Sequence, residues 1–242
     1  QILRMPNENS KGKNEITLHG SIKANDIFIQ YPGSKDPVFE SLTFTLGSGE
    51  LLAIKGDNGS GKTSLINILS GILPSSRGSI LIDETEINQF NLDWFRKNII
   101  FLPQHPSFVG SDIISNLIGI NKIEKSKLEQ ILEEVDLTSF INSNPNGLKY
   151  DMQNHEHSLP FGIKKRIALA RALINDGKIV ILDEPTEGLD EKGREKINEL
   201  ISKFIKQKKT IIVASHDSQI TKDANVIIDL NIKPKPKLIR NT

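Results

Sequence analysis

The sequence predicts an α/β fold in which a parallel sheet is covered by helices on both faces. Residues 179–182 and 211–214 are continuously apolar, as strands buried on both faces require. Helical periodicity over 126–141 and 191–207 alternates with such strands along the chain. A glycine-rich loop joins the apolar run 51–54 to a further helical segment. Alternation of strands and helices of this kind is typical of a parallel sheet.

Composition sets the limits of the functional interpretation. The 242 residues suffice for one large domain or for a core with an inserted subdomain. Lysine and arginine total 31 and aspartate and glutamate 30, so no concentrated basic face is expected and we predict no nucleic-acid partner. The chain has no cysteine, which excludes disulfides and thiolate metal sites. No apolar run reaches membrane-spanning length, so we expect a soluble domain, and the start at Gln1 suggests a piece of a longer protein.

The elements can be placed along the chain in order. Strands are expected at 21–31, 37–46 and 50–56, around 78–87, near 99–102, and within 177–185, 209–217 and 224–230. Helices are expected at 62–72, 111–142, 164–173 and 191–207. Residues 1–20 are polar and predict a linker, 142–157 predict a loop, and the basic tail 233–242 is expected to be disordered.

A phosphate-binding loop is the strongest functional signal. The stretch GDNGSGKTS matches G-x-x-x-x-G-K-[ST] and lies between an apolar strand and a helix, which is the context that the motif requires. Glycines let successive N–H groups surround a phosphate, and the helix N-terminus adds partial positive charge. Lys62 is expected to reach the β- and γ-phosphates, and the Thr63 hydroxyl to ligate Mg²⁺. The residues predicted to bind the nucleotide here are Gly56, Asn58, Gly59, Ser60, Gly61, Lys62, Thr63 and Ser64.

Two adjacent carboxylates follow the buried strand in KIVILDEP. Asp183 is expected to hold the Mg²⁺ shell, and Glu184 to orient or deprotonate a water aimed at the γ-phosphate. His216 follows the strand TIIVAS as a candidate contact to the γ-phosphate or to Glu184, although a lone histidine there is usually polar surface. Gln104 follows the strand IIFL as a candidate contact to Mg²⁺ and the attacking water. Tyr31 ends an early strand and is a candidate to stack on a purine, or else an edge-strand core residue.

In this order, the motifs resemble the nucleotide-binding domain of ATP-binding cassette (ABC) transporters, from about residue 21 to residue 230. The resemblance implies a P-loop NTPase (RecA-like) core at 21–105 and 159–232, with an N-terminal antiparallel β-subdomain and an inserted α-helical subdomain at 106–158. It implies ATP and Mg²⁺ as ligands. The matching residues are Tyr31, the Walker A loop 56–63, the Q-loop Gln104, the Walker B pair Asp183 and Glu184, the D-loop Asp190 and the switch residue His216.

The subtype resembles exporters, chiefly through the runs LHGSIKANDIFIQYPGSKDPVFESLTFTL and NLDWFRKNIIFLPQHPSFVGSDIISNLIGI, and is most similar to bacterial exporters of peptides, bacteriocins or toxins. That resemblance implies ATP hydrolysis coupled to export, driven by dimerisation with a second nucleotide-binding domain. It also implies a transmembrane domain, upstream in the same polypeptide, and a place on the cytoplasmic face of the inner or plasma membrane. One alternative is a regulatory or scaffold ABC protein with little hydrolysis. Another is a nucleotide kinase or GTPase, but the helix IALARAL just before IVILDEP counts against it.

One segment departs from the family. The signature Leu-Ser-Gly-Gly-Gln, which completes the partner's γ-phosphate site, is replaced here by Leu159, Pro160, Phe161, Gly162 and Ile163. Pro160 offers neither hydroxyl nor N–H, and Phe161 stands where glycine permits close approach to phosphate. The segment keeps the features of a helix start, with Pro160 expected at the first helical position. We expect a heterodimer in which the partner supplies an intact signature; a homodimer is the alternative and would hydrolyse slowly.

Overall fold

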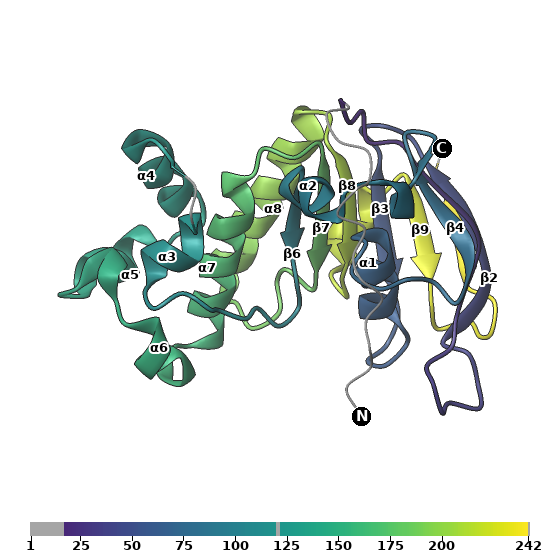
Figure 1. The fold of residues 1–242 in the computed structure, drawn as a ribbon, viewed down its shortest axis with the longest axis horizontal. Helices are drawn as coiled ribbons and strands as arrows, with labels where there is room; N and C mark the ends of the chain where they lie inside the picture. Colours follow the sequence, from purple (N-terminus) through teal and green to yellow (C-terminus); the bar gives the residue numbers. More distant parts are fainter. Residues whose placement is uncertain (1–16, 120–121, 242) are drawn as a thin grey trace.

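Two β-sheets and a group of helices make up the described part of the protein. The computed structural model describes residues 17–119 and 122–241; the first sixteen residues of the predicted linker lie outside this range. Figure 1 shows helices α3 to α6 at one end, strands β2 and β4 at the other, and the central sheet between them. No helix in the described ranges is long and apolar enough to cross a membrane.

The central sheet has six strands in the order β10-β9-β3-β8-β7-β6. Strands β3, β6, β7, β8 and β9 run parallel, and β10 pairs with β9 in the antiparallel sense. Every residue of β7 and β8 is buried, which agrees with their continuous apolar sequence. The strands are β3 (Leu51–Lys55), β6 (Ile99–Leu102), β7 (Ile179–Asp183), β8 (Thr210–Ala214), β9 (Val226–Asp229) and β10 (Lys237–Arg240).

The second sheet is antiparallel and has the order β2-β1-β4-β5. Its strands are β1 (Ile22–Ile29), β2 (Phe39–Leu46), β4 (Arg77–Ile82) and β5 (Thr85–Glu86). Buried and exposed residues alternate along β2, as expected for a sheet with one face on the core. Helix α1 (Lys62–Leu69) packs between this sheet and the central one, because its buried residues share one apolar cluster with both.

The helical subdomain follows β6. It contains α3 (Ile113–Ile118), α4 (Lys125–Glu134), α5 (Thr138–Ser143) and α6 (Met152–His155). The longer helix α7 (Phe161–Ile174) leads back to the sheet and contacts α3, α4 and β6. The other helices are α2 (Leu92–Lys97), α8 (Glu191–Lys206) and α9 (Ser218–Lys222), with 3₁₀ turns at Ile87–Gln89, Gly147–Lys149 and Glu156–Ser158.

The central sheet separates two hydrophobic clusters. Along β3, Leu51 and Ala53 face the cluster that includes the helical subdomain, whereas Leu52 and Ile54 face the cluster that includes α1 and the antiparallel sheet. Successive side chains of a strand point to opposite faces, so each of the five parallel strands contributes to both clusters. The predicted α/β class with an antiparallel β-subdomain and an inserted helical subdomain is therefore confirmed.

Three expectations need correction. The tail 233–242 is not disordered where it is described, because Lys237–Arg240 form β10 on the edge of the central sheet. The stretch 142–157 is not a plain loop, since it contains helix α6 and two 3₁₀ turns. Helix α7 begins at Phe161, three residues before the expected start at Lys164, and Pro160 is its N-cap, not its first residue. The carbonyl of Pro160 accepts hydrogen bonds from the N–H groups of Ile163 and Lys164.

Candidate active site

The phosphate-binding loop runs from β3 to α1, and its glycines meet a geometric need. Gly61 caps α1 with φ = 110° and ψ = 13°, a left-handed conformation. A Cβ at this position would collide with Cγ1 of Val38. Gly59 also has a positive φ, of 79°. The loop can therefore wrap closely at the start of α1, where N–H groups without helical partners attract anions.

Lys62 lies at the centre of the polar contacts. Its ammonium donates to the carbonyl oxygens of Gly56 at 2.6 Å and Asp57 at 3.3 Å. It also lies 3.2 Å from Oε1 of Glu184 and 3.0 Å from Nε2 of His216. The side chain is only 7% exposed, so its charge is screened little by solvent. This arrangement brings together the phosphate loop and the ends of two neighbouring strands.

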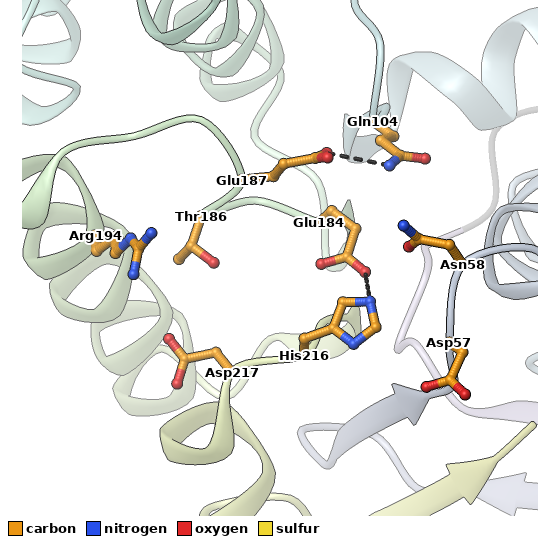
Figure 2. Close-up of a pocket in the computed structure, with 9 residues that line it drawn as sticks. All are labelled: Asp57, Asn58, Gln104, Glu184, Thr186, Glu187, Arg194, His216 and Asp217. Atoms are coloured by element: carbon orange, nitrogen blue, oxygen red, sulfur yellow. Dashed lines mark hydrogen bonds and ion pairs between the residues drawn. The ribbon is translucent and has the colours of Figure 1, made fainter. Parts of the chain in front are cut away.

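Glu184 and His216 meet across the ends of β7 and β8. Nε2 of His216 lies 3.2 Å from Oε1 of Glu184, and Figure 2 shows both side chains in the middle of the cleft. Glu184 has a φ of 46°, an uncommon conformation for a residue with a side chain. Its N–H donates to the carbonyl of Ala214 at 2.8 Å. An Nε2 without a hydrogen would accept a hydrogen bond from the Lys62 ammonium, whereas an Nε2–H would donate one to Oε1 of Glu184.

Asp183, Thr63 and Gln104 make up the candidate magnesium site. Asp183 is buried, and its Oδ1 has no hydrogen-bond partner among the described residues. Burial raises the pKa of Asp183, and the nearby Thr63 hydroxyl lowers it in part. The Thr63 hydroxyl donates to Oε1 of Gln104 at 3.4 Å. An unpartnered carboxylate oxygen beside a hydroxyl and an amide oxygen suits Mg²⁺, which takes few protein ligands together with phosphate oxygens.

Tyr31 lies beside the loop, and its hydroxyl is 2.8 Å from Oγ of Ser64. It is 44% exposed, and it lines a cleft of about 330 Å³. Most residues predicted to bind nucleotide also line this cleft, namely Asn58, Gly59, Gly61, Lys62, Thr63 and Ser64, and Gln104 lies beside them. A solvent-accessible ring beside the phosphate loop fits the role of a stacking platform better than that of a core residue.

A larger cleft of about 670 Å³ adjoins the first, and Asn58 and Gln104 line both. Figure 2 shows Arg194 and Asp217 on the side of Glu184 away from Asn58. Thr186, Glu187, Arg194 and Asp217 also line this cleft, and none of the four was predicted from the sequence. Thr186 and Glu187 closely follow Glu184, and Asp217 follows His216. Their closeness in sequence to predicted site residues could have indicated that they lie at the same edge of the sheet.

The segment 159–163 has a definite structure. Leu159 is buried, and the ring of Phe161 packs over Gly188, where a Cβ would collide with it. Phe161 also lies 6.0 Å, between ring centroids, from His105. Asp190 caps α8 through a hydrogen bond from the N–H of Gly193 and accepts another from Arg166, each at 3.0 Å. The segment forms the start of α7, as predicted, and the Phe161 ring occupies the space beside Gly188.

Three residues with close contacts to this region were not predicted from the sequence. Lys165 is 1% exposed, and its ammonium donates to the carbonyl of Glu184. Lys233 donates to the carbonyls of Val38 and Ser60, the latter at 2.6 Å, and Oδ1 of Asn231 accepts from the N–H of Asp57 at 2.7 Å. Residues 233–242 were expected to be disordered, and no sequence motif indicated the contacts that Lys233 makes.

The chain matches a known protein family and several of its members. The sequence profile of the family described as ABC transporter matches residues 39–187. The chain is 30% identical over 229 residues to the multidrug resistance-like ATP-binding protein MdlB of Buchnera aphidicola, which covers 95% of the chain and 39% of that protein. It is 31% identical over 230 residues to the human antigen peptide transporter 2, covering 94% of the chain and 33% of that protein.

A plant relative and a solved structure give matches of the same kind. The chain is 32% identical over 212 residues to ABC transporter B family member 13 of Arabidopsis thaliana, covering 86% of the chain and 17% of that protein. The fold matches a bacterial Atm1-family ABC exporter with ATP bound at a TM-score of 0.81 and 21% identity, covering 94% of the chain and 40% of the other. The chain thus spans well under half the length of the relatives that it matches.

Proposed function

The chain belongs to the ABC transporter family, whose ATP-binding domains are ATPases, and we propose that it binds and hydrolyses ATP to power a membrane exporter. The observation that carries the proposal is the meeting of Lys62, Glu184 and His216 at one point beside the phosphate loop. A second domain of the same kind and a transmembrane domain would be its partners, at the cytoplasmic face of the membrane. Peptides, proteins or other exported compounds are the proposed cargo.

ATP binding would reorganise the contacts of Lys62. The β- and γ-phosphates offer its ammonium stronger acceptors than the carbonyl of Gly56, because charge-assisted hydrogen bonds are about twice as strong as neutral ones. Tyr31 would stack on the purine, while the loop glycines surround the phosphates. Bound Mg²⁺ would neutralise phosphate charge and be held by Thr63 and Asp183, with Gln104 beside them.

Hydrolysis would depend on Glu184. Once Lys62 turns to the phosphates, the Glu184 carboxylate is free to accept a proton from a water or to orient it. His216 lies on the same carboxylate oxygen and would hold Glu184 in place or contact the γ-phosphate. A positioned general base contributes about 10²–10⁴-fold in rate, so this residue should dominate turnover.

The altered segment argues for an asymmetric dimer. Pro160 lacks an N–H, and Phe161 is committed to packing over Gly188, so neither suits a contact to the partner's γ-phosphate. The site built from this chain's loop would then need the signature of a different partner chain, and the opposite site would hold ATP without fast turnover. The second candidate, a regulatory or scaffold ABC protein, is favoured by the same segment, but the complete Asp183, Glu184 and His216 set favours hydrolysis.

The experiment compares the two sites in the complete transporter. Glu184→Gln in this chain should abolish most ATP turnover, measured as phosphate release, whereas the equivalent substitution in a partner chain should have little effect. Equal loss from either chain would contradict the asymmetric arrangement. Binding of ATP with no measurable turnover in the unmodified transporter would favour the regulatory protein instead.

A further inference from the structure

Lys165 is a fully buried cation for which the proposed reaction gives no role. It lies on the first turns of α7, four residues after Phe161, and is 1% exposed. Burial of an ammonium is costly unless its protons are bonded to acceptors. Burial lowers the pKa of Lys165, while Glu187, Glu184 and Asp183 oppose that shift. The buried ammonium of Lys165 therefore needs acceptors close to it.

Those acceptors belong to the loop that carries the proposed general base. The ammonium donates to the carbonyl of Glu184 and, at 3.3 Å, to the carbonyl of Glu187. It also lies 3.9 Å from Oε2 of Glu187. One cation thus joins two carbonyls three residues apart and ties the loop 184–187 to the N-terminal part of α7. Within the loop, the N–H of Glu187 donates to the carbonyl of Glu184 at 3.2 Å. Figure 2 shows this loop as the support from which Glu184 and Glu187 reach into the cleft.

The backbone of Glu184 needs such support. Its φ of 46° is unfavourable for a residue with a Cβ and persists only when the surroundings determine it. The N–H of Glu184 is held by the carbonyl of Ala214, and its carbonyl is held by Lys165. The peptide groups on both sides of the Glu184 side chain are therefore fixed, one by β8 and one by α7.

Phe161 completes the arrangement from the other side. The Lys165 ammonium lies 5.2 Å from the centroid of the Phe161 ring, within the range of a cation–π contact. The same ring packs over Gly188, where only a residue without a Cβ leaves it room. The ring therefore covers the ammonium and supports Gly188, the residue that follows the loop 184–187.

From these contacts we infer that Lys165 and Phe161 are positioning residues that hold the Glu184 carboxylate of their own chain. The altered segment has then gained a function within this chain, in addition to losing a contact to the partner's nucleotide. The inference rests on the proposed ATP hydrolysis at Glu184. It predicts that a family-like glycine at position 161 impairs the reaction at this chain's own phosphate loop.

The first test removes the ammonium in the complete transporter. Lys165→Met should lower kcat for ATP by about tenfold or more, since small misplacement of a catalytic group has effects of this size or larger. KM for ATP and the affinity for a fluorescent ATP analogue should change less than about threefold, because the phosphate contacts remain. Lys165→Gln keeps one N–H donor and should be intermediate. Lys164→Met removes a neighbouring charge without these contacts and should match the unmodified protein.

The second test asks whether the apolar bulk of Phe161 is sufficient or whether its aromatic ring is needed. Phe161→Leu keeps apolar bulk over Gly188 and should retain much of kcat, whereas Phe161→Gly should lose it about as Lys165→Met does. Unchanged kcat in folded Lys165→Met, or higher kcat in Phe161→Gly, would overturn the inference. If the methionine variant does not fold, Lys165→Gln and the Phe161 pair decide in the same way. Failure of the proposed hydrolysis is distinct, because Glu184→Gln would then leave turnover unchanged.

Discussion

The ammonium of Lys62 lies 3.2 Å from Oε1 of Glu184, and both side chains are less than a tenth exposed. The same carboxylate oxygen lies 3.2 Å from Nε2 of His216. The lysine proposed to bind the phosphates is thus paired with the carboxylate proposed to act on the attacking water. Binding of a triphosphate would break this pair, so one event both fills the loop and releases the base.

Glu184→Gln should therefore lower ATP turnover without weakening ATP binding. ATP turnover should fall by about 10²-fold or more, the lower end for loss of a general base. ATP affinity should rise or stay equal, since the neutral amide competes less for Lys62. Phosphate release and equilibrium titration with an ATP analogue measure the two effects. Glu195→Gln, which removes an exposed carboxylate of α8, is the matched control; weaker ATP binding in Glu184→Gln would contradict the competition.

Asp183→Asn should raise the Tm of the protein without ligand. It should also abolish the further rise in Tm that Mg²⁺ and ATP cause. The folded pKa of Asp183 is raised, so its ionisation costs stability as pH rises from the unfolded value of 3.8 through the folded value. At pH 7 the variant avoids this cost, and Tm should rise by about 2–4 °C. Thermal unfolding with and without Mg²⁺ and ATP is the measurement. A lower Tm than the unmodified protein at pH 7 would refute this reasoning.

Lys233→Met should weaken ATP binding with little effect on kcat. The Lys233 ammonium links the carbonyl of Ser60, in the phosphate loop, to that of Val38 beside it. Loss of about 1 kcal/mol of hydrogen bonding corresponds to a rise of about fivefold in the Kd for ATP. Lys235→Met removes the same charge two residues away and should bind ATP normally. Equal affinities of the two variants would show that the contact does not shape the loop.

Asp83→Ala should destabilise the protein where the chain enters β1. The Asp83 carboxylate accepts hydrogen bonds from the N–H groups of His19, Gly20 and Ser21 and from the Ser21 hydroxyl. Burial raises the pKa of Asp83, but these hydrogen bonds outweigh burial and leave it below 3.8.

The loss should be about 2 kcal/mol, or roughly 4–8 °C in Tm, at pH 7. Because the folded pKa is lowered, this stability is present above pH 3.8 and is lost as pH falls through the folded value. The gap in Tm between Asp83→Ala and the unmodified protein should therefore narrow in acid. Asp83→Asn, which keeps one acceptor oxygen, should lie between them; a gap that widens in acid would be inconsistent with a charged acceptor.

The sequence was sufficient for the features that depend on local pattern. The phosphate loop, the strand that ends in Asp183 and the strand before His216 each combine an apolar run with a chemical motif, so their meeting at one sheet edge followed from the topology of a parallel sheet. The strand around 99–102 was predicted with its observed bounds, as β6. The roles assigned to the site residues remain predictions.

The contacts that hold the site in place could not be read from local pattern. Among the described strands, β10 pairs with β9 alone, and all four of its residues are exposed, so no apolar alternation marked it in the sequence. Lys165 stands in a helix of mixed composition, and its burial depends on the loop 184–187, which is distant in sequence. Pro160 was expected at the first helical position, but its extended ψ of 142° makes it the cap.

The division of the core by the central sheet has a practical consequence for spectroscopy. Ala53 and Ile54 are adjacent in β3, yet their methyl groups lie in different clusters, the first shared with the helical subdomain and the second with α1. In methyl-labelled samples, a rotation of the helical subdomain should shift the Ala53 resonance, and a change at the phosphate loop should shift that of Ile54. Two neighbouring residues would thus report separately on the helical subdomain and on the phosphate loop.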